Sequence, residues 1–196
     1  MNNNAKVFGA GHRGMVGRAI VRRLQAGGHD RVMPTNLYGP NDNYDLATSH
    51  VLPALIRKAH EAKLRGDAQF VVSGTGSPKR EFLYVDDLAD ACVHLMEQGY
   101  DGDLLNIGTG EDVSIGELAQ TVMQVVGFNG RIVFDSSKPD GTPRKLLDVS
   151  RLAALGWRAS TALRAGVLRA YADFAAKESL AAAQALLSTI ESRNHG

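Results

Sequence analysis

The sequence predicts an α/β protein built on a parallel sheet. Short apolar runs such as Gln69–Val72 and Arg131–Phe134 alternate along the chain with segments of helical periodicity. Near the start, the apolar pair Val7–Phe8 is followed by a glycine-rich turn and then by helical spacing from Val16 to Ala26. Strands that alternate with helices in this way are typical of a parallel sheet covered by helices.

The glycine-rich turn is the first candidate binding element. Glycines between a strand and a helix allow the backbone to approach a phosphate, and the helix N-terminus behind them offers unpaired N–H groups. We interpret the turn as a site for a dinucleotide pyrophosphate, against the alternative of an ordinary turn in a chain where glycine supplies 21 of 196 residues. The candidate cofactor-binding residues are Gly11, His12, Arg13, Gly14, Met15, Val16 and Gly17.

The composition favours a cytoplasmic globular protein. Lys and Arg number 22 against 21 Asp and Glu, so no nucleic-acid or membrane-binding basic surface is indicated. The N-terminus has no apolar signal region, and no apolar run approaches the roughly 20 residues that span a bilayer. Cys92 is the only cysteine, which excludes an internal disulfide and a multi-cysteine metal site. We predict no metal.

The predicted nucleotide-binding sheet is incomplete. Such a sheet continues with several strand–helix crossovers of about 30 residues each, and with a ribose-contacting residue about 20 positions after the glycines. Here the chain passes from Gly28 to Arg31 and reaches Pro34 after one short strand near Val32–Met33, and a loop is expected after Pro40.

The remaining elements follow from periodicity and capping signals. Asp86 and Asp87 predict the cap of a helix through Met96, whose apolar face includes Cys92 as a core residue. Ser114 and Glu117 have the spacing of a capping box. The other expected elements are a helix over His50–Lys63, strands over Gln69–Val72, Glu81–Val85, Asp103–Ile107 and Arg131–Phe134, a short helix over Ser150–Leu155 and a helical C-terminal part from Leu163.

Five segments in order resemble the extended short-chain dehydrogenase/reductases, and among these the GDP-L-fucose synthase family. They are Gly11–Gly17, Pro34–Pro40, Arg80–Asp87, Asn106–Gly110 and Ser137–Asp148. Of these, Pro34–Pro40 looks like the loop after a central strand in the family, so the resemblance implies a loop there. The glycine loop is shared by many relatives, whereas His12–Gly17 together with Lys138–Asp148 is highly specific.

The resemblance implies a Rossmann-like parallel sheet with a smaller C-terminal substrate domain. We expect residues 1–40 to be the truncated N-terminal part of the dinucleotide-binding domain. Residues 41–196 are expected to form mostly the substrate domain, with 81–110 returning to the Rossmann core. Compared with the family, roughly 130 residues are absent near Gly28–Arg31, about four crossover units.

The implied activity is the NADPH-dependent 3,5-epimerisation and 4-reduction of GDP-4-dehydro-6-deoxy-D-mannose to GDP-L-fucose. In the family, the absent segment carries the catalytic Ser, Tyr-xxx-Lys and Cys. The lysine of that motif lowers the tyrosine pKa so that it can donate a proton. None of the five tyrosines here has a lysine four positions later, because Asp42, Thr48, Leu88, Leu104 and Ala175 stand there. We therefore expect impaired catalysis.

The resemblance also assigns site residues. His50 matches the catalytic histidine and a cofactor contact, and Arg13 could meet the 2′-phosphate that distinguishes NADP from NAD. Pro34, Thr35, Asn36 and Leu37 match further cofactor positions, and Lys58, Arg80, Asp140 and Lys145 match contacts to the GDP-sugar. Two departures stand out: the family has arginine at Lys58 and an aromatic residue at Ser73.

Simpler interpretations stay open at each position. His50 could be a polar residue at a helix N-terminus, Lys58 a solvated helix charge, Lys145 a loop charge, and Arg80 the partner of Glu81 in a surface ion pair. For the whole chain, the alternatives are a non-catalytic nucleotide-sugar binding module and a UDP-sugar epimerase. The family resemblance implies a homodimer, and the missing strands predict exposed sheet edges and poor solubility.

Overall fold

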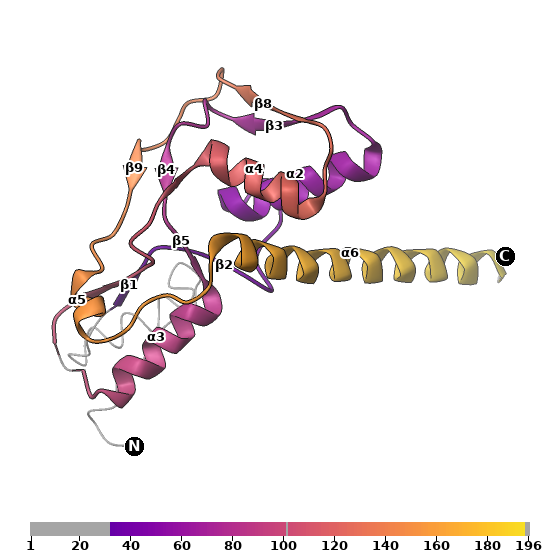
Figure 1. The fold of residues 1–196 in the computed structure, drawn as a ribbon. Helices are drawn as coiled ribbons and strands as arrows, with labels where there is room; N and C mark the ends of the chain where they lie inside the picture. Colours follow the sequence, from indigo (N-terminus) through magenta and orange to yellow (C-terminus); the bar gives the residue numbers. More distant parts are fainter. Residues whose placement is uncertain (1–31, 101, 195–196) are drawn as a thin grey trace. The chain divides into compact units, whose positions relative to one another are not determined.

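The computed structural model describes residues 32–100 and 102–194, which divide between two compact units (Figure 1). The described part of unit 1 comprises residues 32–37, Glu81–Glu111 without residue 101, and Leu146–Ser160. Unit 2 comprises Tyr38–Arg80, Asp112–Lys145 and residues 161–194. The glycine turn Gly11–Gly17 and the junction Gly28–Arg31 lie outside the described residues.

Unit 1 contains two pairs of short strands. β1 (Val32–Pro34) runs parallel to β6 (Leu105–Ile107), with Pro34 opposite Ile107. β2 (Asn36–Tyr38), whose last residue is counted with unit 2, pairs with β5 (Phe82–Tyr84). The expected loop from Pro34 to Pro40 is therefore wrong in part, because β1 includes Pro34 and a second strand begins two residues later.

Two helices cover the strands of unit 1. They are α3 (Val85–Glu97) and α5 (Ser150–Ala154), and α5 packs against β6. The predicted cap at Asp86 and Asp87 is wrong: the N-cap residue of α3 is Tyr84, so both carboxylates lie in the first turn, where they suit the positive end of the helix dipole. The hydrophobic core of unit 1 consists of Leu83, Leu88, Ala91, Leu95, Leu105, Ile107, Leu152 and Trp157.

Unit 2 is built around a second parallel strand pair and two packed helices. β3 (Gln69–Ser73) and β8 (Arg131–Asp135) pair over their whole length, and α2 (Val51–Arg65) packs on β3 and on α4 (Ile115–Val126) (Figure 1). Phe70 and Val72 of β3 alternate with exposed residues and face the core, as expected for a strand with one buried face.

The capping box predicted at the start of α4 is confirmed. Ser114 accepts a hydrogen bond from the N–H of Glu117, whose carboxylate accepts from the N–H of Ser114, so the capping box at the start of α4 is complete. Gly66 and Gly127 end α2 and α4 in the left-handed conformation, with φ of 70° at both.

A small three-stranded sheet completes the strands of unit 2. β4 (Lys79–Arg80) lies between β7 (Val113–Ser114), which is antiparallel to it, and β9 (Arg144–Lys145), which is parallel. β9 lies within Ser137–Asp148, one of the segments that carry the resemblance, and no strand was among the expected elements there. Each of these strands has two residues, too few for alternation to be recognised.

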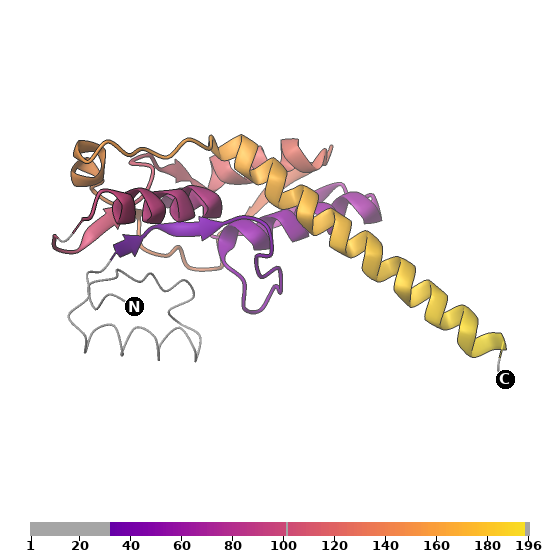
Figure 2. The same ribbon diagram turned by 90° about the horizontal axis from the view of Figure 1, so that it is seen from below.

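The last element, α6 (Leu163–Asn194), is anchored at its N-terminal end. It packs against α4 and buries Val167, Ala170 and Phe174. Figure 2 shows its C-terminal half running on beyond the other elements of unit 2. In the described ranges no helix, α6 included, is both long enough and apolar enough to cross a bilayer.

The predicted α/β class with an incomplete parallel sheet is confirmed. Parallel pairs occur in both units, yet the described strands form four separate small sheets instead of one continuous one. The predicted division at residue 40, with 81–110 returning to the first domain, stays a prediction.

Candidate functional site

The predicted cofactor segment Pro34–Leu37 lies where β1 ends. The N–H of Thr35 donates to the carbonyl of Ile107 at 3.0 Å, which extends the parallel pairing one residue beyond β1. Leu37 packs against the core of unit 1. Ligands of parallel α/β sheets bind beyond the carboxyl ends of the strands. The position of this segment therefore fits a nucleotide cofactor.

The polar side chains of this segment are already engaged. Thr35 Oγ1 and Asn36 Nδ2 both donate to the main-chain carbonyl of Glu81, at 3.3 and 2.8 Å. These bonds brace the segment against β5, so it would offer a bound cofactor a fixed backbone.

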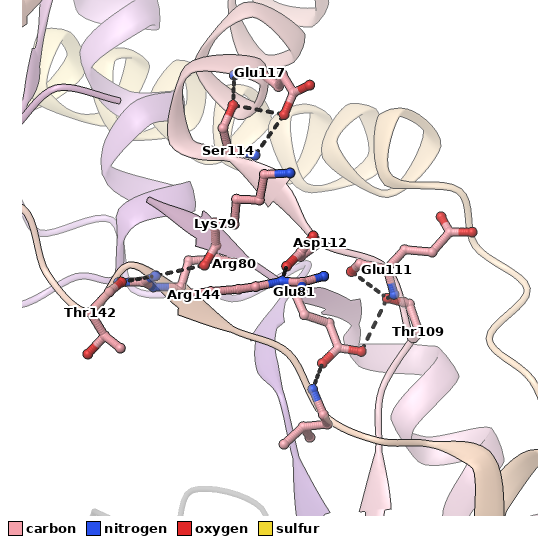
Figure 3. Close-up of polar contacts among 11 residues, drawn as sticks. Lys79, Arg80, Glu81, Thr109, Glu111, Asp112, Ser114, Glu117, Thr142 and Arg144 are labelled. Atoms are coloured by element: carbon pink, nitrogen blue, oxygen red, sulfur yellow. Dashed lines mark hydrogen bonds and ion pairs between the residues drawn. The ribbon is translucent and has the colours of Figure 1, made fainter. Parts of the chain in front are cut away.

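Glu81 is a residue whose importance the sequence did not reveal. It is fully buried, and its carboxylate accepts the N–H of Gly110 at 2.7 Å and that of Leu147 at 3.0 Å. Figure 3 shows the same carboxylate beside the hydroxyl of Thr109. Arg80 donates instead to the carbonyls of Lys79 and Thr142. The alternative of a surface ion pair between Arg80 and Glu81 is therefore excluded. No local pattern marks Glu81, because its partners lie 29 and 66 residues away.

His50 is exposed at the start of α2. It is the N-cap residue, its carbonyl accepts the N–H of Ala54 at 3.1 Å, and its ring makes no capping bond. Its charge acts on Asp42: burial raises the pKa of Asp42, while the N–H of Asn43 and the nearby His50 oppose that rise. The imidazole ring is therefore not occupied in capping the helix, and it is accessible to a substrate, as required for a group that exchanges protons with it.

Lys58 lies two turns further along α2. It is half-buried, and its Nζ reaches the carbonyl of Val71 on β3 at 3.4 Å. One long hydrogen bond leaves two N–H donors for an anionic ligand. The position is compatible with a phosphate contact.

Arg80 and Lys145 come together on neighbouring strands. They lie directly opposite each other in the parallel pair of β4 and β9, which places two cationic side chains on adjacent strands. Arg80 Nη1 is held by the carbonyls of Lys79 and Thr142, at 2.7 and 2.6 Å (Figure 3). Lys145 is exposed.

Asp140 lies in the loop that leads to β9, in the same unit. Its two oxygens accept the N–H and the hydroxyl of Thr75, at 2.9 and 2.6 Å. These bonds hold the pKa of Asp140 below its usual range. Gly74 permits the approach, since a Cβ there would lie 2.3 Å from Asp140 Oδ1.

Two further cations belong to the same small sheet and were not predicted. Lys79 precedes Arg80 on β4, and Arg144 precedes Lys145 on β9. Arg144 donates to the carboxylate of Asp112 and lowers its pKa, with a smaller contribution from Lys79 (Figure 3). Four cationic residues on two paired strands could be recognised only once β4 and β9 were seen to pair.

The structure thus distributes the predicted residues between the units. Pro34–Leu37 belongs to unit 1 and the remaining described candidates belong to unit 2, where Arg80, Asp140 and Lys145 share one small sheet and its loop. Cations with a hydrogen-bonding loop suit a diphosphate group. Among the residues that the structure describes, no group of three His, Cys, Asp or Glu side chains could hold a metal ion.

The chain is similar to proteins of known families. Residues 31–108 match the NAD dependent epimerase/dehydratase family. The chain is 58% identical over 139 residues to GDP-L-fucose synthase 1 of Arabidopsis thaliana, a match that covers 71% of this chain and 43% of that protein. It is 53% identical over 152 residues to GDP-L-fucose synthase of Escherichia coli (strain K12), covering 73% and 47%.

The fold is likewise similar to that of solved relatives. The GDP-L-fucose synthetase from Naegleria fowleri bound to NADP is 32% identical and superposes with a TM-score of 0.71, over 84% of this chain and 53% of that one. The chain spans less than half the length of the two synthases compared above. The Rossmann-like fold and the resemblance are confirmed: the chain is similar to the GDP-L-fucose synthases, and its residues 31–108 match the NAD dependent epimerase/dehydratase family.

Proposed function

We propose that the chain carries the GDP-sugar site of an NADPH-dependent epimerase-reductase. The reaction is the conversion of GDP-4-dehydro-6-deoxy-D-mannose to GDP-L-fucose. The observation that carries this proposal is the set Arg80, Asp140 and Lys145 around the β4–β9 pair, in a chain 58% identical to a GDP-L-fucose synthase. Arg80 and Lys145 would meet the diphosphate, with Lys58 as a third cation, and Asp140 would accept from a sugar or base hydroxyl or amine.

The proposed cofactor is NADP. Pro34–Leu37 would contact it at the carboxyl end of β1, and the glycine turn Gly11–Gly17 with Arg13 would hold its phosphates. The NADP-bound relative from Naegleria fowleri supports this assignment. When bound, the cofactor supplies hydride to the sugar. The imidazole of His50 would transfer a proton to or from the sugar ring during epimerisation.

We further propose that this chain turns its substrate over slowly or not at all. The supporting observation is that no tyrosine has a lysine four residues later, and a positioned acid contributes about 10²–10⁴-fold to a rate. The same observation favours the second candidate, a nucleotide-sugar binding module without catalysis. Both versions predict a functional GDP-sugar site, and they differ in turnover.

Calorimetric titration of the full chain tests the site. GDP and GDP-fucose are expected to give saturable heats with the wild-type chain. Their affinities are expected to fall at least about tenfold in the double variant Arg80→Ala, Lys145→Ala. The matched control is Arg131→Gln, an exposed cation on β8 whose Nε contacts Gln69. No heat with any of GDP, GDP-fucose or NADPH would overturn the proposal.

Two further measurements separate the alternatives. NADPH oxidation with GDP-4-dehydro-6-deoxy-D-mannose distinguishes an impaired enzyme from a binding module, and a normal rate contradicts the proposed impairment. A thermal-shift panel of GDP- and UDP-sugars tests the UDP-sugar alternative. Light scattering tests the homodimer that we carry over from the family as part of this proposal.

A further inference from the structure

Glu81 presents a buried charged group that the proposed reaction does not use. It connects β4 to β5 and is fully buried, and Asp87 is the only other charged residue among the described ones that is buried. Burying a carboxylate is costly unless hydrogen bonds or a cation compensate it. Within residues 32–100 and 102–194, no Lys, Arg or His forms an ion pair with Glu81. Hydrogen bonds therefore have to compensate the burial.

The carboxylate is satisfied by donors from two distant segments. Oε1 accepts the N–H of Gly110 at 2.7 Å and, more weakly, the hydroxyl of Thr109 at 3.4 Å. Oε2 accepts the N–H of Leu147 at 3.0 Å. Both oxygens act only as acceptors, so a carboxylate fits this position and an amide does not, because its NH₂ would face an N–H.

The main chain of the same residue fixes a third segment. The carbonyl of Glu81 accepts Asn36 Nδ2 at 2.8 Å and Thr35 Oγ1 at 3.3 Å. One residue thus ties together the end of β1, the turn after β6 and the segment at Leu147, all within unit 1.

The glycines of the motif Asn106–Gly110 are explained by this carboxylate. A Cβ at Gly108 would lie 2.3 Å from Glu81 Oε1, so only glycine leaves room for the side chain. Gly110, the N–H donor, has φ of +76°, a conformation that other residues rarely adopt. The proposed substrate and cofactor contacts assign no role to this motif, and the packing of Glu81 does.

We propose that Glu81 is a positioning residue that pre-organises the cofactor segment. Its carboxylate locks the turn at Gly110 and the backbone at Leu147, and this fixes the carbonyl that receives Thr35 and Asn36. Glu81 therefore acts through these two residues and not by touching a ligand. The inference rests on the proposed NADP role of Pro34–Leu37.

A purely structural role of Glu81 would give a different result. If Glu81 only filled the core, its replacement would loosen unit 1 evenly and weaken the binding of every ligand through unfolding. If Glu81 is a positioning residue, its replacement instead loosens only residues 35–37, Gly110 and Leu147. NADPH binding is then weakened selectively, while GDP binding at the site of unit 2 is unaffected.

The experiment compares Glu81→Gln with Glu97→Gln, an exposed glutamate at the end of α3. In full-length folded protein, hydrogen exchange is expected to accelerate at least about tenfold at 35–37, 110 and 147 in Glu81→Gln, with the amides of α3 little changed. NADPH affinity is expected to fall about tenfold or more and GDP affinity to stay within about twofold. Uniform acceleration across unit 1, or unchanged exchange at 35–37, overturns the proposal.

A second variant keeps the test decisive if Glu81→Gln does not fold. Asn36→Ala removes one donor to the Glu81 carbonyl and leaves the carboxylate bonds intact. It is expected to accelerate exchange at 35–37 but not at Gly110 or Leu147, and no change at 35–37 contradicts the proposal. If wild-type protein binds no NADPH, the proposed cofactor role of Pro34–Leu37 fails, whereas the exchange pattern still decides whether Glu81 fixes that segment.

Discussion

Asp140 closes the loop after β3 by binding Thr75 with both carboxylate oxygens. The N–H and the hydroxyl of Thr75 donate to it at 2.9 and 2.6 Å, across 65 residues of sequence. Thr75 Oγ1 also lies 2.7 Å from Ser77 Oγ, so the contact continues along the loop. A residue assigned to the GDP-sugar by resemblance therefore already has a structural partner, and the two roles can be separated by mutation.

The first prediction concerns Asp140→Ala. We expect a lower melting temperature, because Thr75 loses its acceptor, together with a fall in GDP-fucose affinity of about tenfold. Thr75→Val removes only the hydroxyl and should lower the melting temperature with a smaller loss of affinity. Calorimetric titration and thermal melts measure both effects. Equal losses of affinity in the two variants would mean that Asp140 acts only through the loop.

The second prediction is a loss of stability in acid. Hydrogen bonds from Asn41 and Lys177 hold the pKa of Asp173 below its ordinary value of 3.8, and the bonds from Ser114 hold that of Glu117 below its ordinary 4.5. Groups with a lowered folded pKa contribute stability that is present above the unfolded pKa and lost as pH falls through the folded pKa. Unit 2 should therefore be most stable above about pH 5 and weaken progressively below about pH 4.

Urea unfolding at pH 3 to 7 measures this dependence. Asp173→Asn should flatten the acid limb, because the variant has no titrating group at that position. Asp42 works in the opposite sense: burial raises its pKa, so its ionisation costs stability as pH rises. Asp42→Asn should therefore steepen the net acid dependence. An identical pH profile in all three proteins contradicts the assignment.

The third prediction concerns Gly108→Ala. The added Cβ would lie 2.3 Å from the Glu81 carboxylate, which is buried and cannot move aside without losing its bonds. Overpacking of this kind costs about 1–3 kcal/mol. Gly116→Ala is the matched control, since its Cβ would meet nothing closer than 3.5 Å and lies in α4. Urea unfolding should show the control unchanged or stabilised by up to about 1 kcal/mol.

Much of this fold could be predicted from local patterns. The helix expected over His50–Lys63 is Val51–Arg65, and the strand expected over Gln69–Val72 is Gln69–Ser73. Periodicity and capping identify such elements because their hydrogen bonds and buried faces lie within a few residues.

The features that could not be predicted depend on distant partners. β4 and β9 are two residues long, and they are strands only because their backbones pair with each other, with Arg80 opposite Lys145 across 65 positions of sequence. Glu81 stands in the sequence like any charged surface residue, and it is buried because Gly110 and Leu147 supply its donors. Long-range pairing of this kind has no local signature, so both the cation pair and the buried carboxylate had to be seen in the structure.

The fourth prediction tests the capping box. Ser114→Ala removes the hydroxyl that accepts from the N–H of Glu117 and leaves an unpaired donor at the start of α4. The expected cost is about 1 kcal/mol, measured by urea unfolding. Gln120→Ala, an exposed change within the same helix, should be neutral or slightly stabilising. Equal stability of the Ser114→Ala variant and the wild type would show that α4 is held by packing alone.

The last prediction concerns the reactivity of Cys92. Its side chain is partly buried against the core of unit 1, and burial raises its pKa to about 11 from an ordinary value of 9.0. A rise of that size lowers the thiolate fraction at pH 8 about a hundredfold, so alkylation by iodoacetamide should be slow in folded protein and reach an ordinary thiol rate in urea. Labelling followed by mass spectrometry measures both rates. A fast reaction in the folded state would contradict the prediction that burial protects Cys92, and Cys92 would again be a candidate for a functional thiol. A slow one leaves this chain without a substitute for the family's catalytic cysteine, in agreement with the proposed impairment.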